Sequence, residues 1–157
     1  CAMKALSIRQ PWAWAILHAG KRIENRDWKG CSYRGPLLIH AAKGCGKAEF
    51  DDAIESIITI GAPRGLVRTV AEMSVALRGV HHGEGTWVPR DEMQFGGIVG
   101  VCDVVDVVRE STDPWFFGPL GLVLANVRPL PFVPLNGALG LFEVPDAVVA
   151  KALGAAR

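Results

Sequence analysis

The chain has 157 residues, of which 50% are hydrophobic and 21% charged, and its formal net charge is +1. This length predicts one domain, with a core large enough to fold without disulfide bridges or a structural metal. The near-neutral charge argues against binding of nucleic acid through the whole surface, so any basic site must be local. The first quarter does hold a local excess of basic residues, at Lys4, Arg9, Lys21, Arg22, Arg26, Lys29 and Arg34.

The four cysteines, at positions 1, 31, 45 and 102, form no C-x-x-C pair. Their spacing argues against a zinc site and a disulfide framework, and it favours a reducing compartment. No basic-then-apolar signal sequence opens the chain, and its most apolar run is too short to cross a bilayer. We therefore expect a cytoplasmic protein with no membrane partner, metal or cofactor. Met3 is expected to be the natural first residue, with Cys1 and Ala2 left from cloning.

The first quarter of the chain predicts a strand, a helix and a second strand. Residues 4–8 form a short apolar run, which indicates a strand. Pro11 suits the first turn of a helix, because its backbone angle is fixed and it has no N–H. Gly20 is placed to end this helix in a left-handed conformation. Residues 22–28 then alternate as a strand does, which puts every second side chain on one face.

The middle of the chain predicts a buried strand, helices and a long loop. Residues 36–42 are an apolar run bounded by turn residues, which is typical of a buried strand. Residues 48–60 carry apolar side chains at helical spacing, and residues 67–77 indicate a second helix. Residues 79–97 are rich in glycine and charge, so we expect a mobile loop of the length that often serves as a lid or binding loop.

Residues 97–108 give the strongest strand signal in the sequence. After this strand the sequence predicts a turn-rich aromatic loop over residues 113–119, a strand over 120–127 and a proline-rich extended segment over 128–134. A short strand over residues 140–144 and a terminal helix over 146–153 follow. Short strands with helices inserted between them favour an α+β fold built on a small mixed β-barrel, rather than a doubly wound sheet.

Three polar side chains near the second predicted strand carry the sharpest chemical hypothesis. Glu24 and Arg26 share one face of that strand, and Lys21 lies at its edge. A lysine that loses part of its hydration can act as a base or an electrostatic clamp. The carboxylate can orient the lysine or move protons, and the arginine can hold a carbonyl or a phosphate. A solvated strand edge with ordinary ion pairs is the alternative interpretation.

Four tryptophans are candidates for stacking on a nucleobase, because every base offers a π-face to a flat ring: Trp12, Trp14, Trp28 and Trp115. Packing in the core is the alternative for each of them. Trp12 is the preferred stacking residue because it follows Arg9 and Gln10 at the start of the first helix. Backbone N–H groups at that position favour anions.

Two ionisable residues inside predicted strands have alternative interpretations. In a regular strand Asp103 shares a face with several valines and needs a cationic partner such as Lys21, whereas a bulge would turn it toward solvent. His40, inside an apolar strand, is interpreted either as a hydrogen-bonded core histidine or as a residue of the site. Glu110 and Asp113 are further candidates for an acid near the site.

With these residues in place, the sequence resembles the ASCH domain family. Lys21, Glu24 and Arg26 fit the K-x-x-E-x-R part of the family motif G-x-K-x-x-E-x-R, with Gly20 directly before the lysine. Segments that also look like the family cover residues 7–13, 34–41, 97–101, 126–130 and 140–142. The likeness predicts a single ASCH domain over residues 3–157, with a helical insertion near residues 46–95.

The resemblance implies a β-barrel related to the PUA fold, with the motif in a cleft that binds RNA or nucleotides. Some members of the wider family are amidohydrolases that remove the acetyl group from N4-acetylcytidine, and others have been described as ribonucleases. The amidohydrolase branch has a threonine nucleophile where this chain has Glu24. A downstream glutamate completes the triad of that branch, and its candidate counterparts here are Asp103, Glu110 and Asp113.

We therefore expect a PUA-like ASCH barrel whose cleft takes a modified nucleoside or single-stranded RNA. The candidate catalytic residues are Lys21, Glu24 and Asp103, and the candidate substrate-binding residues are Arg9, Gln10, Trp12, Arg26, Trp28 and His40. Hydrolysis of an N4-acylated cytosine would use water activated by Lys21 and Glu24, with Arg26 stabilising the oxyanion. The alternatives are a non-catalytic RNA-binding module and a metal-independent ribonuclease with Lys21 or His40 as its base.

Overall fold

The described residues form an α+β fold on one six-stranded sheet. The structure is a computed structural model, and it describes residues 2–61, 80–82, 86–88 and 93–154. The strands of this sheet are β1 (Lys4–Ile8), β2 (Ile23–Arg26), β3 (Gly35–Ala41), β6 (Gly97–Val108), β7 (Leu120–Pro134) and β8 (Leu141–Glu143). The helices in the described part are α1 (Trp12–His18), α2 (Lys47–Gly61) and α4 (Asp146–Gly154).

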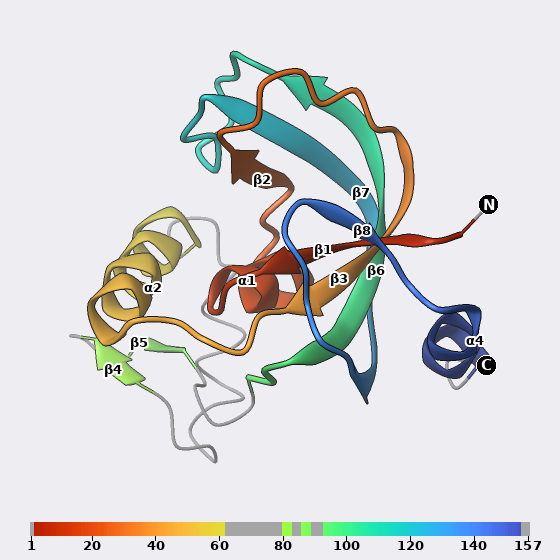
Figure 1. The fold of residues 1–157 in the computed structure, drawn as a ribbon. Helices are drawn as coiled ribbons and strands as arrows, with labels where there is room; N and C mark the ends of the chain where they lie inside the picture. The colour runs from red at the N-terminus through yellow and green to blue at the C-terminus, as the bar shows by residue number, and fades with distance from the viewer. Residues whose placement is uncertain (1, 62–79, 83–85, 89–92, 155–157) are drawn as a thin grey trace.

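The sheet is curled into a half-barrel (Figure 1). Its strand order is β2-β7-β6-β3-β1-β8. Neighbouring strands are antiparallel except β1 and β3, which run parallel. Figure 1 shows α1 close to the sheet with α2 beyond it, and α4 at the opposite side of the molecule. The expected mixed β-barrel architecture is confirmed.

Within the described residues the core has three parts, and each joins one helix to its surroundings. In the first, Ile16 of α1 packs with sheet residues such as Leu37 and Leu122. In the second, the apolar face of α2 packs against the other side of α1. In the third, Ala152 of α4 packs with outer-face residues such as Leu38 of β3. Each fully buried leucine or isoleucine contributes about 1.5–3 kcal/mol relative to an exposed one.

Apolar periodicity predicted most elements close to their observed bounds. The strand predicted over residues 97–108 corresponds to β6 residue for residue, and the helix predicted over residues 48–60 corresponds to α2. The strand predicted over residues 120–127 continues through the proline-rich segment to Pro134. Within the described residues β2 pairs only with the first four residues of β7, so the later prolines lie where one edge of β7 is unpaired.

The region between α2 and β6 departs from the sequence prediction. Within the predicted loop 79–97, β4 (Val80–His82) and β5 (Thr86–Val88) pair as a separate antiparallel ribbon. The prediction of a loop was wrong for these residues, because both short segments contain β-prone residues such as Val80, Trp87 and Val88. The helix predicted over residues 67–77 lies outside the described residues.

The described part of the chain holds no helix with the length and apolar character needed to cross a membrane.

Candidate functional site

A pocket of about 330 Å³ lies where β1, β2 and the start of α1 meet the loop before β8. We call it the motif pocket, because residues of the predicted motif line it. The lining residues are Ser7, Arg9, Trp12, Glu24, Asn25, Arg26, Ala138, Leu139 and Gly140. Its volume is at the lower end of the range for small-ligand sites, which suits a ligand of the size of a nucleobase or nucleoside.

A second hollow, of about 420 Å³, lies between α2 and the exposed ring of Phe117. Asp52 and Glu55 are its charged lining residues, and the described part of the chain contributes no cation to this lining. A site of this charge does not suit a phosphate or a carbonyl oxygen. The motif pocket is therefore the candidate functional site.

Lys21 is brought inside the fold by the turn that follows α1. Gly20 has a positive φ of 70°, and the Lys21 N–H donates to the Ala15 carbonyl at 3.1 Å. The lysine is only 1% exposed. Its Nζ donates to the Ile23 carbonyl at 2.5 Å and to Glu24 Oε2 at 2.8 Å. A buried ammonium needs such partners because it has lost its water.

Glu24 is held between two cations. Its Oε2 accepts from Lys21, and its Oε1 lies 3.1 Å from Arg26 Nη2. The side chains of Lys21 and Glu24 are 2% and 9% exposed, so this is a buried network. The interpretation as a solvated strand edge with ordinary ion pairs is therefore wrong.

Arg26 is anchored at one end of its guanidinium and unpaired at the other. Nη2 donates to the Ser7 carbonyl at 2.9 Å, and Cζ lies 5.3 Å from the centre of the Trp28 ring. Within the described residues, Nε is buried without a hydrogen-bond partner, and Nη1 also has none. The side chain is 22% exposed and lines the motif pocket. Arg26 therefore has donor capacity left for a ligand.

Trp12 forms an aromatic wall of the motif pocket. Its ring lies 5.4 Å from Lys21 Nζ and 5.9 Å from the Phe117 ring. Trp14 and Trp115 are instead 4% and 3% exposed and belong to the core between α1 and α2. Of the four candidate tryptophans, the structure thus places Trp12 in the pocket and Trp28 behind Arg26.

The ASCH domain model matches residues 6–116, which is most of the chain. The chain belongs to the ASCH domain family. Among solved structures it is similar to an ASCH protein from Zymomonas mobilis and to a point mutant of that protein. Each is 10% identical to this ASCH domain, with a TM-score of 0.49, and the alignments cover 96% of this chain and 92% and 96% of theirs. No curated protein matches the chain.

Arg9 and Gln10, two predicted binding residues of the ASCH domain, have different surroundings. Arg9 lines the motif pocket and forms an exposed ion pair with Glu49 of α2. Gln10 is 3% exposed; its Oε1 accepts from the Trp14 N–H at 2.9 Å and its Nε2 donates to the Gln94 carbonyl at 3.0 Å. The amide of Gln10 thus holds the start of α1, and the structure does not bring it into the pocket.

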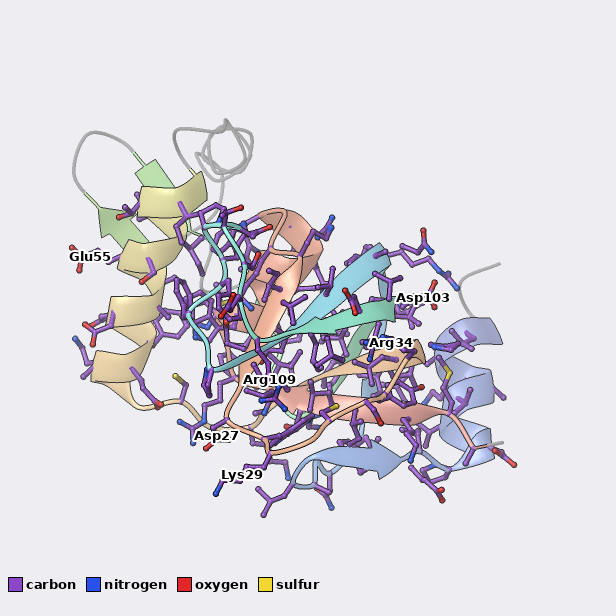
Figure 2. The ribbon with its side chains drawn as sticks, turned by 90° about the horizontal axis from the view of Figure 1, so that it is seen from above. Asp27, Lys29, Arg34, Glu55, Asp103 and Arg109 are labelled. Carbon is purple, nitrogen blue, oxygen red and sulfur yellow. The ribbon has the colours of Figure 1, made fainter. Side chains whose placement is uncertain are left out.

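Asp103 lies away from the motif. The β6–β7 register shifts between Val101 and Asp103, and Asp103 Oδ2 accepts from Asn126 Nδ2 at 2.8 Å. Figure 2 shows Asp103 on the opposite side of the molecule from Glu55 of α2. Burial and the nearby Asp103 charge raise the pKa of the Cys102 thiol to about 12. The structure does not bring Asp103 to Lys21, and its catalytic role stays a prediction.

His40 is 1% exposed and has a partner on each ring nitrogen. Nδ1 lies 3.0 Å from Ser7 Oγ, and Nε2 lies 2.7 Å from the Leu135 carbonyl oxygen. It is a hydrogen-bonded histidine behind the pocket lining, joined to the pocket through Ser7. Of the further acids, Asp113 accepts from the Trp115 N–H at 2.8 Å and thereby shapes the turn before β7.

Sequence reasoning missed three parts of the site. Asn25 ties β2 to the aromatic loop, since its Nδ2 donates to the Trp115 carbonyl at 2.9 Å and its Oδ1 accepts from the Phe117 N–H at 2.8 Å. The position of Asn25 between Glu24 and Arg26 of the motif was the sequence signal that could have indicated its role. Ser7 preceded the motif as part of a family-like segment and Gly140 begins another, whereas residues 138 and 139 gave no signal of a site.

In the described part of the ASCH domain, no group of three or more histidines, cysteines and acids is arranged to hold a metal ion.

Proposed function

We propose that the ASCH domain binds a nucleobase in the motif pocket, presented by a modified nucleoside or by single-stranded RNA. The observation that carries this proposal is the placement of Arg26. It lines a pocket of about 330 Å³, its Nη1 has no partner among the described residues, and Trp12 lines the same pocket. A guanidinium donates well to a carbonyl oxygen or a phosphate, and an indole stacks on any base.

The network behind the pocket supports this function by fixing the binding groups. Lys21 and Arg26 flank Glu24, so two cations and one carboxylate leave one net positive charge at the pocket wall. Lys21 also lies against the Trp12 ring, 5.4 Å from its centre, which steadies the stacking surface. Binding groups held in advance lose less conformational entropy when a ligand arrives.

Arg9 extends the positive charge to the edge of the pocket. Its ion pair with Glu49 is exposed, with side chains that are 61% and 54% accessible. Such surface pairs are worth only about 0–1 kcal/mol, so a ligand phosphate can compete for Arg9 at little cost. This supports a nucleotide or an RNA strand over a free base as the ligand.

Hydrolysis of an N4-acylated cytosine is the second candidate function. The unpaired Nη1 of Arg26 favours it, because a donor at that place can stabilise an oxyanion. Both oxygens of Glu24 are engaged by cations, and Lys21 does not line the pocket. These contacts suit positioning rather than activation of water, so a hydrolytic reaction needs another nucleophile. Cleavage of RNA by His40 is less favoured, because His40 lies behind the pocket lining.

Calorimetric titration with N4-acetylcytidine, cytidine 5′-monophosphate and a short single-stranded RNA tests the binding proposal. We expect Arg26→Gln to weaken binding of each by about 10- to 150-fold, the equivalent of a charged hydrogen bond of about 1.5–3 kcal/mol. Arg34→Gln is the matched control, because Arg34 pairs with Asp106 on the surface outside the pocket. Equal affinities of the Arg26 and Arg34 variants would contradict the proposal, as would a lack of binding by the unmodified protein.

A further inference from the structure

Ser7 and His40 form a hydrogen-bonded pair that the binding proposal does not use. The Nε2 of His40 lies 2.7 Å from the Leu135 carbonyl oxygen, which can only accept a hydrogen bond. Nε2 therefore carries the proton, and in the neutral ring Nδ1 is left as an acceptor. Ser7 Oγ lies 3.0 Å from this Nδ1 and donates its hydroxyl proton to it. The imidazole is thus held in the tautomer that can take a proton from the serine.

Contacts between segments that are distant in the sequence bring Ser7 and His40 together. Ser7 of β1 and His40 of β3 are partners in the parallel register of the two strands. The loop after β7 closes over them: a Cβ on Gly137 would lie 2.8 Å from His40 Cε1 and 3.0 Å from Ser7 Oγ. Any side chain at Gly137 would therefore press on the pair, and glycine permits the close approach.

Ser7 also belongs to the motif pocket, whereas His40 lies behind it. Ser7 is partly exposed and is one of the lining residues, and its carbonyl accepts from Arg26 Nη2 at 2.9 Å. The serine is thereby fixed next to Arg26, whose Nη1 has no hydrogen-bond partner among the described residues. A nucleophile, a base, a group that orients the base and an oxyanion donor are the parts that acyl transfer requires.

We propose that Ser7 is the nucleophile of an acyl-transfer reaction on an ester or amide bound in the motif pocket, with His40 as its base. The Leu135 carbonyl orients the base, and Arg26 stabilises the oxyanion. The inference rests on the proposed function, in that the pocket must take the ligand, and it narrows the substrate class to acylated compounds. The inference also assigns a hydroxyl nucleophile to this site, where the motif has the carboxylate of Glu24 in place of a threonine hydroxyl.

The reaction balances with water as the only co-reactant. Ser7 Oγ forms a bond to the acyl carbon while its proton moves to His40 Nδ1. The tetrahedral intermediate then expels the amine or alcohol, which takes that proton from His40, and an acyl-serine remains. Water attacks the acyl carbon, again giving its proton to His40, and the ester bond to Ser7 breaks. The proton returns to Ser7 Oγ, and the products are a carboxylic acid and the free amine or alcohol.

A purely structural pair would look the same but would not react. In that case the Ser7 hydroxyl only satisfies the buried histidine, and its reactivity equals that of any other serine. The reactivity of Ser7 therefore separates the two roles. It can be read on the unmodified protein, without relying on a variant that must fold.

The test is incubation of the unmodified protein with a fluorophosphonate, which forms a bond from a serine oxygen to phosphorus and releases fluoride. We expect one adduct by intact mass, mapped by peptide sequencing to Ser7. The exposed Ser32 provides the matched control, because Ser32→Ala should label like the unmodified protein and Ser7→Ala should not label. His40→Gln should slow labelling by about 100- to 10,000-fold, the contribution of a general base.

No adduct, or an adduct on another residue, would overturn the proposal.

Calorimetry on the same unmodified protein separates this proposal from the binding proposal. Nucleoside binding without a Ser7 adduct would refute acyl transfer and leave the binding function standing. A Ser7 adduct without nucleoside binding would support a reactive serine and refute the nucleobase ligand.

Discussion

Replacing Glu24 with glutamine is expected to lower the free energy of unfolding by about 3–5 kcal/mol. The Lys21 side chain is 2% exposed, and Glu24 is its carboxylate partner at 2.8 Å. Without that charge the ammonium stays buried with neutral partners among the described residues: the Ile23 carbonyl, the Trp12 ring and the amide oxygen of the new glutamine. A buried charge without a counter-charge is strongly destabilising. Urea denaturation with linear extrapolation measures the change.

Lys21→Met is the matched control for this prediction. It removes the ammonium and keeps an apolar stem, while Glu24 keeps its ion pair with Arg26. We therefore expect a smaller loss of stability than for Glu24→Gln. The double variant should recover part of the loss, because no uncompensated ammonium remains in the core. Additive losses in the double variant, or a larger loss for Lys21→Met, would show that Glu24 is not the central counter-charge.

Replacing Trp12 with leucine is expected to weaken nucleoside binding by about 5- to 150-fold, the equivalent of about 1–3 kcal/mol of stacking. Trp12 lines the motif pocket and also packs against Phe117, with ring centres 5.9 Å apart. Leucine keeps apolar volume but offers no flat face to a base. Calorimetric titration with cytidine 5′-monophosphate measures the loss.

Trp14→Phe is the control for this second prediction. Trp14 lies on the same helix and is 4% exposed in the core, outside the lining of the motif pocket. Its replacement should lower stability and leave the affinity within about twofold of the unmodified protein. An equal loss of affinity in both variants would mean that binding responds to the general integrity of α1 rather than to stacking on Trp12.

The sequence predicted most elements of the fold, because their signals are local. The apolar runs of β3 and β6 and the helical spacing of α2 depend on neighbouring residues only, and they appear near the predicted bounds. The ribbon of β4 and β5 was missed, since glycine and charge in the segment outweighed its short β-prone runs.

The candidate site was predicted in part. The motif brought Lys21, Glu24 and Arg26 together as expected, because they lie within six consecutive residues of one turn and strand. The burial of Lys21 could not be predicted, because it depends on how the Trp12 ring of α1 packs against the lysine side chain. Gln10 was expected to face the ligand, but an amide before a helix can serve the helix backbone instead.

The remaining parts of the site depend on contacts between distant segments. The link between Ser7 and His40 requires the parallel pairing of β1 with β3, and no local pattern encodes that register. For Asp103 the sequence left a regular strand and a bulge as alternatives, and the register of β6 and β7 shifts beside it. The wall formed by residues 138–140 comes from the far end of the chain, where Gly140 begins a family-like segment and residues 138 and 139 belong to none.

The most direct test of the central claim is a nuclear magnetic resonance titration of the tryptophan indole N–H signals with cytidine 5′-monophosphate. If a base enters the motif pocket, the Trp12 signal should shift strongly and saturably, because a stacked ring changes its magnetic environment. Trp14 and Trp115, which are buried outside the pocket, should shift little. An unmoved Trp12 signal at saturating ligand, or equal shifts of all three signals, would contradict a nucleobase site in the motif pocket.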